Sequence, residues 1–298
     1  MKKKLSIIVA IALLSSTVVA KPLEKGATEL KMSACGVTRV AFMKELNSAF
    51  SKKFGIKIPM NKKGGDLFVL SGVHKKEADI GSGCRYTLKN VENEKNIFST
   101  QVAWGALSFI VHAKNSVKNI STENIKKVLT GKITNWKELG GEDKPINVIL
   151  RDHKHSGIGV IVRESLFKNK EQSLLKGAKL VKSSGFVREA VGQDIYAFAV
   201  DNVISSGRDK KIKMLKVDGI EATKENILAE KYKLRQALYL YLTEKPKDLA
   251  KKYVNFALSE EGQSVISKTG TANLEEATGK DDAENLIFQD LQLGVKTQ

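Results

Sequence analysis

Short apolar runs alternate with amphipathic helical segments in the first third of the chain, and this alternation constrains the fold most. Residues 29–32, 56–60 and 78–81 have the composition of short strands. Residues 38–54 carry Val, Met, Leu and Phe at helical spacing, and residues 66–74 are a second predicted helix. Strands that are joined by helices pair in parallel through right-handed crossovers. The sequence therefore predicts an α/β fold with a mainly parallel sheet.

The N-terminus has the layout of a secretory signal peptide. Three lysines follow Met1, residues 5–14 are apolar, and small residues precede Lys21. The apolar run is shorter than the about 20 residues that a transmembrane helix needs. No cysteine lies near the expected cleavage point after Ala20. We expect residues 1–20 to be removed and the protein to be free in the periplasm, without a stable membrane anchor.

Size and charge narrow the function classes. Cleavage leaves 278 of the 298 residues, which is the length of about two domains. The formal net charge of +17 is spread along the chain, as on solvated faces, although such a field also attracts anions. No aromatic and basic cluster points to nucleic acid, and no nucleophile elbow, zinc-protease motif or Walker loop points to catalysis. The sequence predicts neither an enzyme nor a cofactor.

Two later segments carry a family resemblance. Residues 129–141 follow a predicted helix at 121–129 and contain Trp136 and a pair of glycines. Residues 253–263 belong to a predicted pair of helices near the C-terminus. Both segments closely resemble parts of the phosphate-binding proteins of bacterial phosphate importers. By its type, Trp136 is expected in the core and not at a ligand.

The resemblance implies a two-lobed type II periplasmic binding fold. Each lobe would be a mainly parallel sheet flanked by helices, and two hinge strands at residues 108–113 and 236–242 would join the lobes. Lobe I would combine residues 21–110 with residues 237–298, and lobe II would be residues 111–236. The resemblance assigns no structure or role to the tail at 272–298.

Small residues mark three junctions where a predicted strand gives way to a helix, at residues 33–36, 64–65 and 156–159. The first N–H groups of a helix have no intrahelical partner and lie at the positive end of its dipole, so they can hold an anion. In an open α/β sheet such junctions meet at the carboxyl ends of the strands. Together they predict a binding site for an oxyanion.

The resemblance also assigns side chains to this site. In the family an Arg shortly before Ser-Gly-Thr grips the anion, which implies that Arg151 donates paired hydrogen bonds, Ser156 a hydroxyl and Gly157 an N–H group. Arg85 matches a position that faces the cleft. Without the motif, either Arg would be expected in a surface ion pair. From the other two loops the implied contacts are Cys35, Gly36, Val37, Thr38, Lys63, Gly64 and Cys84.

The loops also differ from the family pattern. Cys35 and Val37 stand where hydroxyl side chains are usual, Ile158 stands where Thr is expected, and Cys84 lies in a run that usually contains Ser. Several hydroxyl donors that surround a phosphate in the family are therefore absent. We expect the ligand to be phosphate or a phosphate-like anion.

Cys35 and Cys84 are the two cysteines of the chain, and both follow strands at the same predicted edge of the sheet. They allow three interpretations. They form a disulfide, as is usual in an oxidising compartment. They remain reduced and, with His155 or His153, bind a soft metal or a metalloid such as arsenite. Or they are two thiols without a role.

The resulting hypothesis is a monomeric periplasmic solute-binding protein that delivers a small inorganic anion to the permease of an ABC importer. The alternative is a periplasmic sensor or chaperone that holds a soft metal or metalloid through Cys35 and Cys84 and signals to a membrane partner.

Overall fold

The computed structural model describes residues 28–61, 64–152 and 154–278. The predicted signal peptide, Lys63 and His153 lie outside the described residues, as does most of the unassigned tail.

Three parallel strands begin the sheet, as the sequence predicts. Met32 at the start of β1 pairs with Met60 on one side and with Ile80 on the other. The elements are β1 (Met32–Ala34), α1 (Gly36–Thr38), a π-helical turn (Arg39–Met43), α2 (Lys44–Phe54), β2 (Met60–Asn61), α3 (Asp66–His74) and β3 (Ile80–Gly83). The helical segment begins at Gly36, earlier than expected, because Cys35 is already the extended N-cap residue. It ends at Gly55, whose φ of 70° suits a glycine.

Two long strands run through the middle of the molecule. They are β4 (Ile97–His112) and β11 (Arg235–Thr243), which pair antiparallel to each other. β4 continues beyond β11 to pair with β8 (Ala197–Asn202). The sheet order is β2-β1-β3-β11-β4-β8, followed by β6 (Asn147–Arg151) and β7 (Lys179–Val181), so the strands expected at 108–113 and 236–242 occupy its centre.

The middle of the chain forms the strands at the other end of this sheet. β6 (Asn147–Arg151) pairs in parallel with β7 (Lys179–Val181) and with β8. The main helices are α4 (Thr122–Thr130), α5 (Gly157–Val162) with a π-helical turn (Arg163–Phe167), α6 (Ser184–Gln193), α7 (Val203–Ser206) and α8 (Lys224–Leu228). Trp136 is 1% exposed and its Nε1 donates to the Tyr196 carbonyl at 2.9 Å, so the prediction of a core residue is confirmed.

The described chain ends on the side where it began. α9 (Asp248–Leu258) and α10 (Glu260–Lys268) match the predicted helix pair. β12 (Ala272–Asn273) then pairs with β4 and leads into α11 (Leu274–Thr278), two elements that the sequence did not predict.

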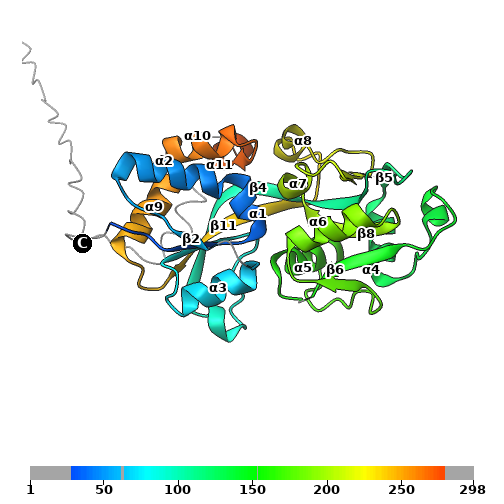
Figure 1. Ribbon diagram of the computed structural model, residues 1–298, viewed down its shortest axis with the longest axis horizontal. Coiled ribbons are helices and arrows are strands. Elements are labelled where there is room, and N and C mark those ends of the chain that lie inside the picture. The colour runs from blue at the N-terminus through cyan, green and yellow to red at the C-terminus, as the bar shows by residue number, and fades with distance from the viewer. Residues whose placement is uncertain (1–27, 62–63, 153, 279–298) are drawn as a thin grey trace, which may run out of the picture.

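Side chains pack into separate cores on the two sides of β4 and β11. We call the side with α1, α2, α3, α9 and α10 the first half, and the side with α4 to α8 the second half (Figure 1). Phe42, Phe50 and Tyr253 are among the large buried side chains in the core of the first half. Phe109 and Phe198 are among the large buried side chains in the main core of the second half. The chain therefore folds into two packed units that share a pair of strands.

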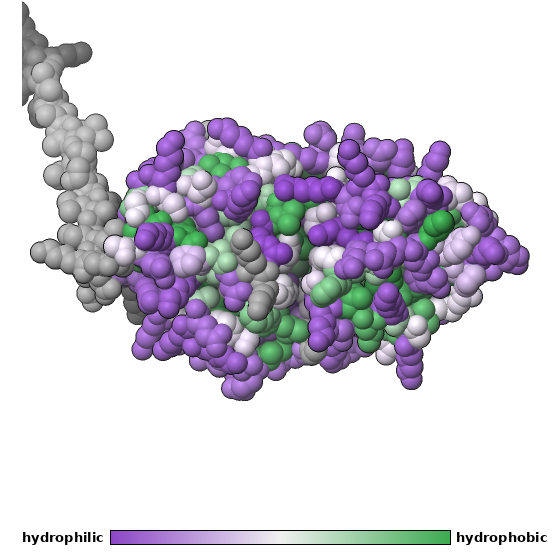
Figure 2. Space-filling model, viewed as in Figure 1, coloured by the Kyte–Doolittle hydropathy of each residue, from purple (hydrophilic) through white to green (hydrophobic). Residues whose placement is uncertain are grey.

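Hydrophilic residues cover most of the face drawn in Figure 2, as expected of a chain with a net charge of +17. Exposed large apolar side chains are few among the described residues, and Leu180, at 58%, is the most exposed of them. No helix in the described part of the chain is long and apolar enough to cross a membrane.

Candidate functional site

Three helix starts meet where the two halves touch. α1 begins after Cys35, α3 begins after Gly65, and α5 begins after Ser156, whose Oγ caps the helix by accepting from the Gly159 N–H group at 3.2 Å. A Cβ atom added to Gly157 would overlap Asp66 Oδ2 and Cys84 Sγ. The start of α5 in the second half therefore lies directly against the first half.

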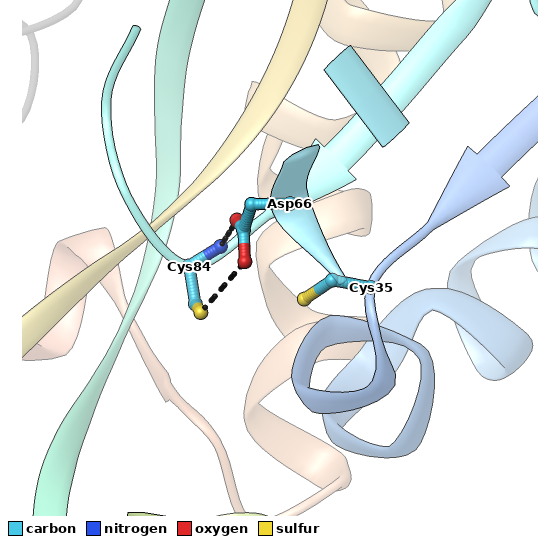
Figure 3. Close-up of side chains that lie close together, drawn as sticks. All are labelled: Cys35, Asp66 and Cys84. Carbon is cyan, nitrogen blue, oxygen red and sulfur yellow. Dashed lines mark hydrogen bonds between the residues drawn. The ribbon is translucent and has the colours of Figure 1, made fainter. Parts of the chain in front are cut away.

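Cys35, Asp66 and Cys84 gather at this contact and point toward one another (Figure 3). They come from the end of β1, the start of α3 and the end of β3. Their exposed fractions are 1%, 3% and 1%. One ligand atom from each lies within 4.8 Å of the other two. We call these three residues the Cys–Asp–Cys cluster.

Hydrogen bonds fix the orientation of Asp66. Its Oδ1 accepts from the Cys84 backbone N–H group at 2.6 Å. The buried Tyr241 hydroxyl lies 3.0 Å from the same oxygen and 2.6 Å from the Arg85 carbonyl, so it shares its proton between them. Oδ2 accepts a hydrogen bond from the Cys84 thiol, whose Sγ is 3.3 Å away. The carboxyl group therefore presents one oxygen to the cysteines.

Hydrogen bonds also hold the backbone of both cysteines in place. The Cys84 carbonyl accepts from Gln236 Nε2 at 2.9 Å, and the Cys35 N–H group donates to the Ser82 carbonyl at 2.9 Å. Hydrogen bonding with Cys35, burial and the Asp66 carboxyl group together raise the pKa of the Cys84 thiol well above its usual value. At neutral pH this residue is therefore a neutral thiol.

The structure holds both cysteines as free thiols, side by side. Of the arrangements that the sequence left open, this is the one with reduced cysteines. The third residue beside them is not the histidine that the sequence suggested. Asp66 completes the cluster, and among the described residues His155 is not one of its members. The sequence offered Asp66 only as the first residue of a helix.

Arg151 reaches toward the first half from the end of β6. Its Nε donates to the Val181 carbonyl at 3.3 Å and its Nη2 to the Lys182 carbonyl at 2.5 Å. A Cβ atom on Gly65 would lie 3.0 Å from Nη2. Within residues 28–61, 64–152 and 154–278 Arg151 makes no ion pair. Its charge therefore lies beside the start of α3, and in the described part of the chain no ion pair neutralises it.

Arg85 occupies a different environment from the one expected. It is fully buried, and its Nη1 and Nη2 bind the two carboxylate oxygens of Glu94 at 2.7 Å and 2.6 Å. Burial, the largest single influence, would lower the pKa of Arg85, but the hydrogen bonds to Glu94 together with the nearby Tyr241 and Asp66 side chains raise that pKa overall. Its Nε donates to the His155 carbonyl at 2.9 Å. The guanidinium group thus ties the first half to the second and is already occupied.

The other expected contact residues line the same helix starts. Gly36 is the first residue of α1, and Val37 and Thr38 are buried behind it. Thr38 Oγ1 lies 3.5 Å from Cys35 Sγ, so this hydroxyl points into the cluster. Gly64 has a φ of 82° in the turn that leads into α3.

Known proteins resemble this chain over most of its length. A model of the PBP superfamily domain matches residues 42–261. The phosphate-binding protein PstS of Borreliella burgdorferi is 29% identical over 213 residues, which are 67% of this chain and 74% of that protein.

Two crystal structures resemble the fold. A putative phosphate ABC transporter substrate-binding protein from Clostridium perfringens, with bound phosphate, has a TM-score of 0.73 and 30% identity over 82% of this chain and 99% of that one. An ABC-type phosphate transport receptor from Vibrio cholerae has a TM-score of 0.62 and 22% identity over 82% and 99% of the two chains. These likenesses agree with the resemblance seen in the sequence and with the expectation of a binder and not a catalyst.

Proposed function

Because the chain belongs to the PBP superfamily, we propose that it captures phosphate or a phosphate-like oxyanion in the periplasm and delivers it to the permease of an ABC importer. The observation that carries the proposal is the meeting of three helix starts beside Arg151, which forms no ion pair with any residue that the structure describes. The names of its relatives in Borreliella burgdorferi and Clostridium perfringens point to the same class of ligand.

The helix starts supply the donors for such an anion. The first N–H groups of α1, α3 and α5 have no partners within their helices, and a helix start favours negative charge. Arg151 adds a fixed positive charge and a planar set of N–H donors that matches oxyanion geometry. Its present bonds to two backbone carbonyls orient the guanidinium group toward α3.

Asp66 supplies the selectivity. A carboxylate beside an anion repels it unless the anion carries a hydroxyl group that can donate to the carboxylate. Hydrogen phosphate and hydrogen arsenate keep such a hydroxyl at neutral pH, whereas sulfate has none. Oδ1 of Asp66 already accepts from the Cys84 N–H group and the Tyr241 hydroxyl, whereas the donor to Oδ2 is the weak Cys84 thiol, so Oδ2 is the acceptor for this hydroxyl. The site should therefore prefer protonated oxyanions to sulfate.

We further propose that the two halves act as the two lobes of a type II binding protein. Lobe I is residues 21–110 with residues 237–298, lobe II is residues 111–236, and β4 and β11 are the hinge strands. Entry of the anion requires the lobes to separate, since Gly157 lies against Asp66 and Cys84, and binding then shifts the population toward the closed form. The protein would reach the periplasm through its signal peptide, act as a monomer and present the closed form to the permease.

Titration calorimetry with anion-free protein tests this proposal. Phosphate and arsenate should each bind at one site per chain, and sulfate should bind at least about 100-fold more weakly. The reason is that sulfate offers no hydroxyl to the buried Asp66 carboxylate, and a buried acceptor that receives no hydrogen bond from the ligand discriminates strongly. The proposal fails if none of the three anions binds, and the role of Asp66 fails if sulfate binds as tightly as phosphate.

A further inference from the structure

The Cys–Asp–Cys cluster is chemically unlike the rest of the candidate anion site. Two sulfur atoms and a carboxyl group are ligands for a cation, and a thiol is only a weak hydrogen-bond donor to an anion. We propose that Cys35, Asp66 and Cys84 form a binding site for a thiophilic divalent metal ion of the zinc class. This goes beyond anion capture and does not depend on it.

The distances suit one small ion. Zinc binds Cys sulfur at about 2.3 Å and carboxylate oxygen at about 2.0–2.2 Å. Two ligand atoms on the same ion therefore lie up to roughly 4.5 Å apart. The three ligand atoms here lie within 4.8 Å of one another and converge on the same point (Figure 3). Small side-chain rotations would bring all three into the coordination sphere.

The groups around the cluster already orient these ligands. Bonds from the Cys84 N–H group and the Tyr241 hydroxyl hold Oδ1 of Asp66, which leaves Oδ2 as a single ligand oxygen. Partners of this kind normally fix metal-binding carboxylates and are part of a metal site. Backbone hydrogen bonds also anchor both cysteines, Cys84 to Gln236 and Cys35 to Ser82. The backbone of both cysteines and one oxygen of Asp66 are thus held in place before any ion arrives.

The mixed set of ligands selects the class of ion. Magnesium and calcium prefer six or more oxygen ligands, and copper(I) favours sulfur ligands alone. Two sulfurs and one oxygen suit zinc or its heavier relative cadmium, both of which accept four-coordinate sites. Three protein ligands leave a fourth position, and Gly157, which has no side chain, lies next to Oδ2 and Cys84 Sγ.

Binding of the metal ion conserves atoms and charge without any redox step. The ion forms bonds to two sulfurs and one oxygen, and the two thiol protons leave to solvent. The resulting group carries a net charge of −1, and the positive end of α5 and Arg151 lie nearby to offset it. Since the ion and the anion hydroxyl both use Oδ2 of Asp66, the hydroxyl contact described above applies to the metal-free protein.

Cobalt(II) and zinc titrations of the reduced, tag-free protein test the site in the absence of phosphate. Cobalt should bind at one ion per chain and produce the intense near-ultraviolet absorption of thiolate coordination, and zinc should displace it. Zinc affinity, measured by competition with a chelator, should fall on the order of 100-fold in Cys35→Ser and in Cys84→Ser and about 10-fold in Asp66→Asn. His155→Gln should keep the wild-type affinity, because its side chain is outside the cluster.

Circular dichroism and melting curves of each variant separate lost ligands from lost folding, with Cys84→Ala as a second variant if Cys84→Ser does not fold. The spectrum of the wild-type cobalt complex needs no variant. Absence of thiolate absorption in the reduced wild-type protein would overturn the proposal. So would folded cysteine variants that bind zinc as tightly as wild type. Phosphate calorimetry is independent of both results, so the failure of anion capture and the failure of the metal site can be told apart.

Discussion

The first half of the molecule faces the junction with Cys35, Asp66 and Cys84, whereas the second half faces it with Arg151 and the start of α5. The first face holds acceptors and thiols, all buried and fixed by hydrogen bonds to neighbouring strands. The second face holds donors, with a half-buried Arg151 whose guanidinium group donates to the backbone carbonyls of Val181 and Lys182. In the proposed anion site, the group that selects the anion and the groups that attract it would thus lie on opposite sides of the contact.

The two arginines sharpen this comparison. Both were expected to grip the ligand, yet Arg85 pairs with Glu94 in the interior while Arg151 has no carboxylate partner among the described residues. An arginine that is already paired is a structural element, and an unpaired arginine beside a helix start is available to an anion. The surroundings of the side chain, and not its type, decide which role it has.

The largest effect is expected where the two faces touch. Gly157→Val should reduce phosphate affinity at least about 1,000-fold, which is about 4 kcal/mol, because its side chain would overlap Asp66 and Cys84 when the halves close. Gly177→Val is the matched control, since a Cβ atom there meets nothing within 4 Å. Calorimetry checks both variants. Wild-type affinity in Gly157→Val would show that the ligand does not bind between these faces.

The next effect concerns the buried ion pair of the first half. Glu94→Gln should lower the free energy of unfolding by about 3 kcal/mol, because it leaves the charge of Arg85 buried without its partner. The phosphate affinity of the folded protein should change little. Glu171→Gln, which breaks the exposed pair with Lys154, should cost less than about 1 kcal/mol.

Urea denaturation and calorimetry separate the two outcomes for Glu94→Gln. If this variant kept its stability but lost phosphate binding, Arg85 would belong to the ligand site after all, and the contrast between the two arginines would disappear.

Arg151→Ala should weaken phosphate binding about 10-fold to 100-fold, the value of a hydrogen bond to a charged group. Its free energy of unfolding should change by less than about 1 kcal/mol, because Arg151 makes no ion pair in the described structure. The exposed Arg208 provides the control variant, Arg208→Ala. Equal affinity of Arg151→Ala and wild type in calorimetry would remove Arg151 from the site.

The smallest change tests the first face. Asp66→Asn should raise sulfate affinity about 10-fold, because the amide can donate a hydrogen bond to an anion that has no hydroxyl. This change corresponds to a loss of about 1.4 kcal/mol of discrimination against sulfate. Asp248→Asn, on the exposed start of α9, should leave sulfate binding as in wild type. A sulfate affinity that does not rise in Asp66→Asn would show that this carboxyl group does not select the anion.

The architecture was predictable because its signals are periodic. The alternation of strands and helices, the two central strands and the C-terminal helix pair all appear in the sequence as apolar spacing, and the predicted α/β fold of type II periplasmic binding proteins agrees with the crystal structures it resembles. β12 was missed because two residues carry no period. The start at Gly36 was missed because Cys35 caps the helix through its backbone conformation, without a side-chain hydrogen bond.

The site was predictable only in part. A local motif brought together Arg151, Ser156 and Gly157, and the structure places all three at the junction of the halves. Asp66 was overlooked because an acidic residue in the first turn of a helix already has an ordinary explanation in the helix dipole. The pairing of Arg85 with Glu94 spans nine residues without a helical period, so only the tertiary fold reveals it.

A crystal structure of the protein with phosphate tests the central claim most directly. We expect a phosphate ion between the starts of α3 and α5, with one oxygen bonded to the Arg151 guanidinium group and a second within hydrogen-bond distance of Asp66 Oδ2. Phosphate bound elsewhere, or at this place without contact to either Arg151 or Asp66, would contradict it.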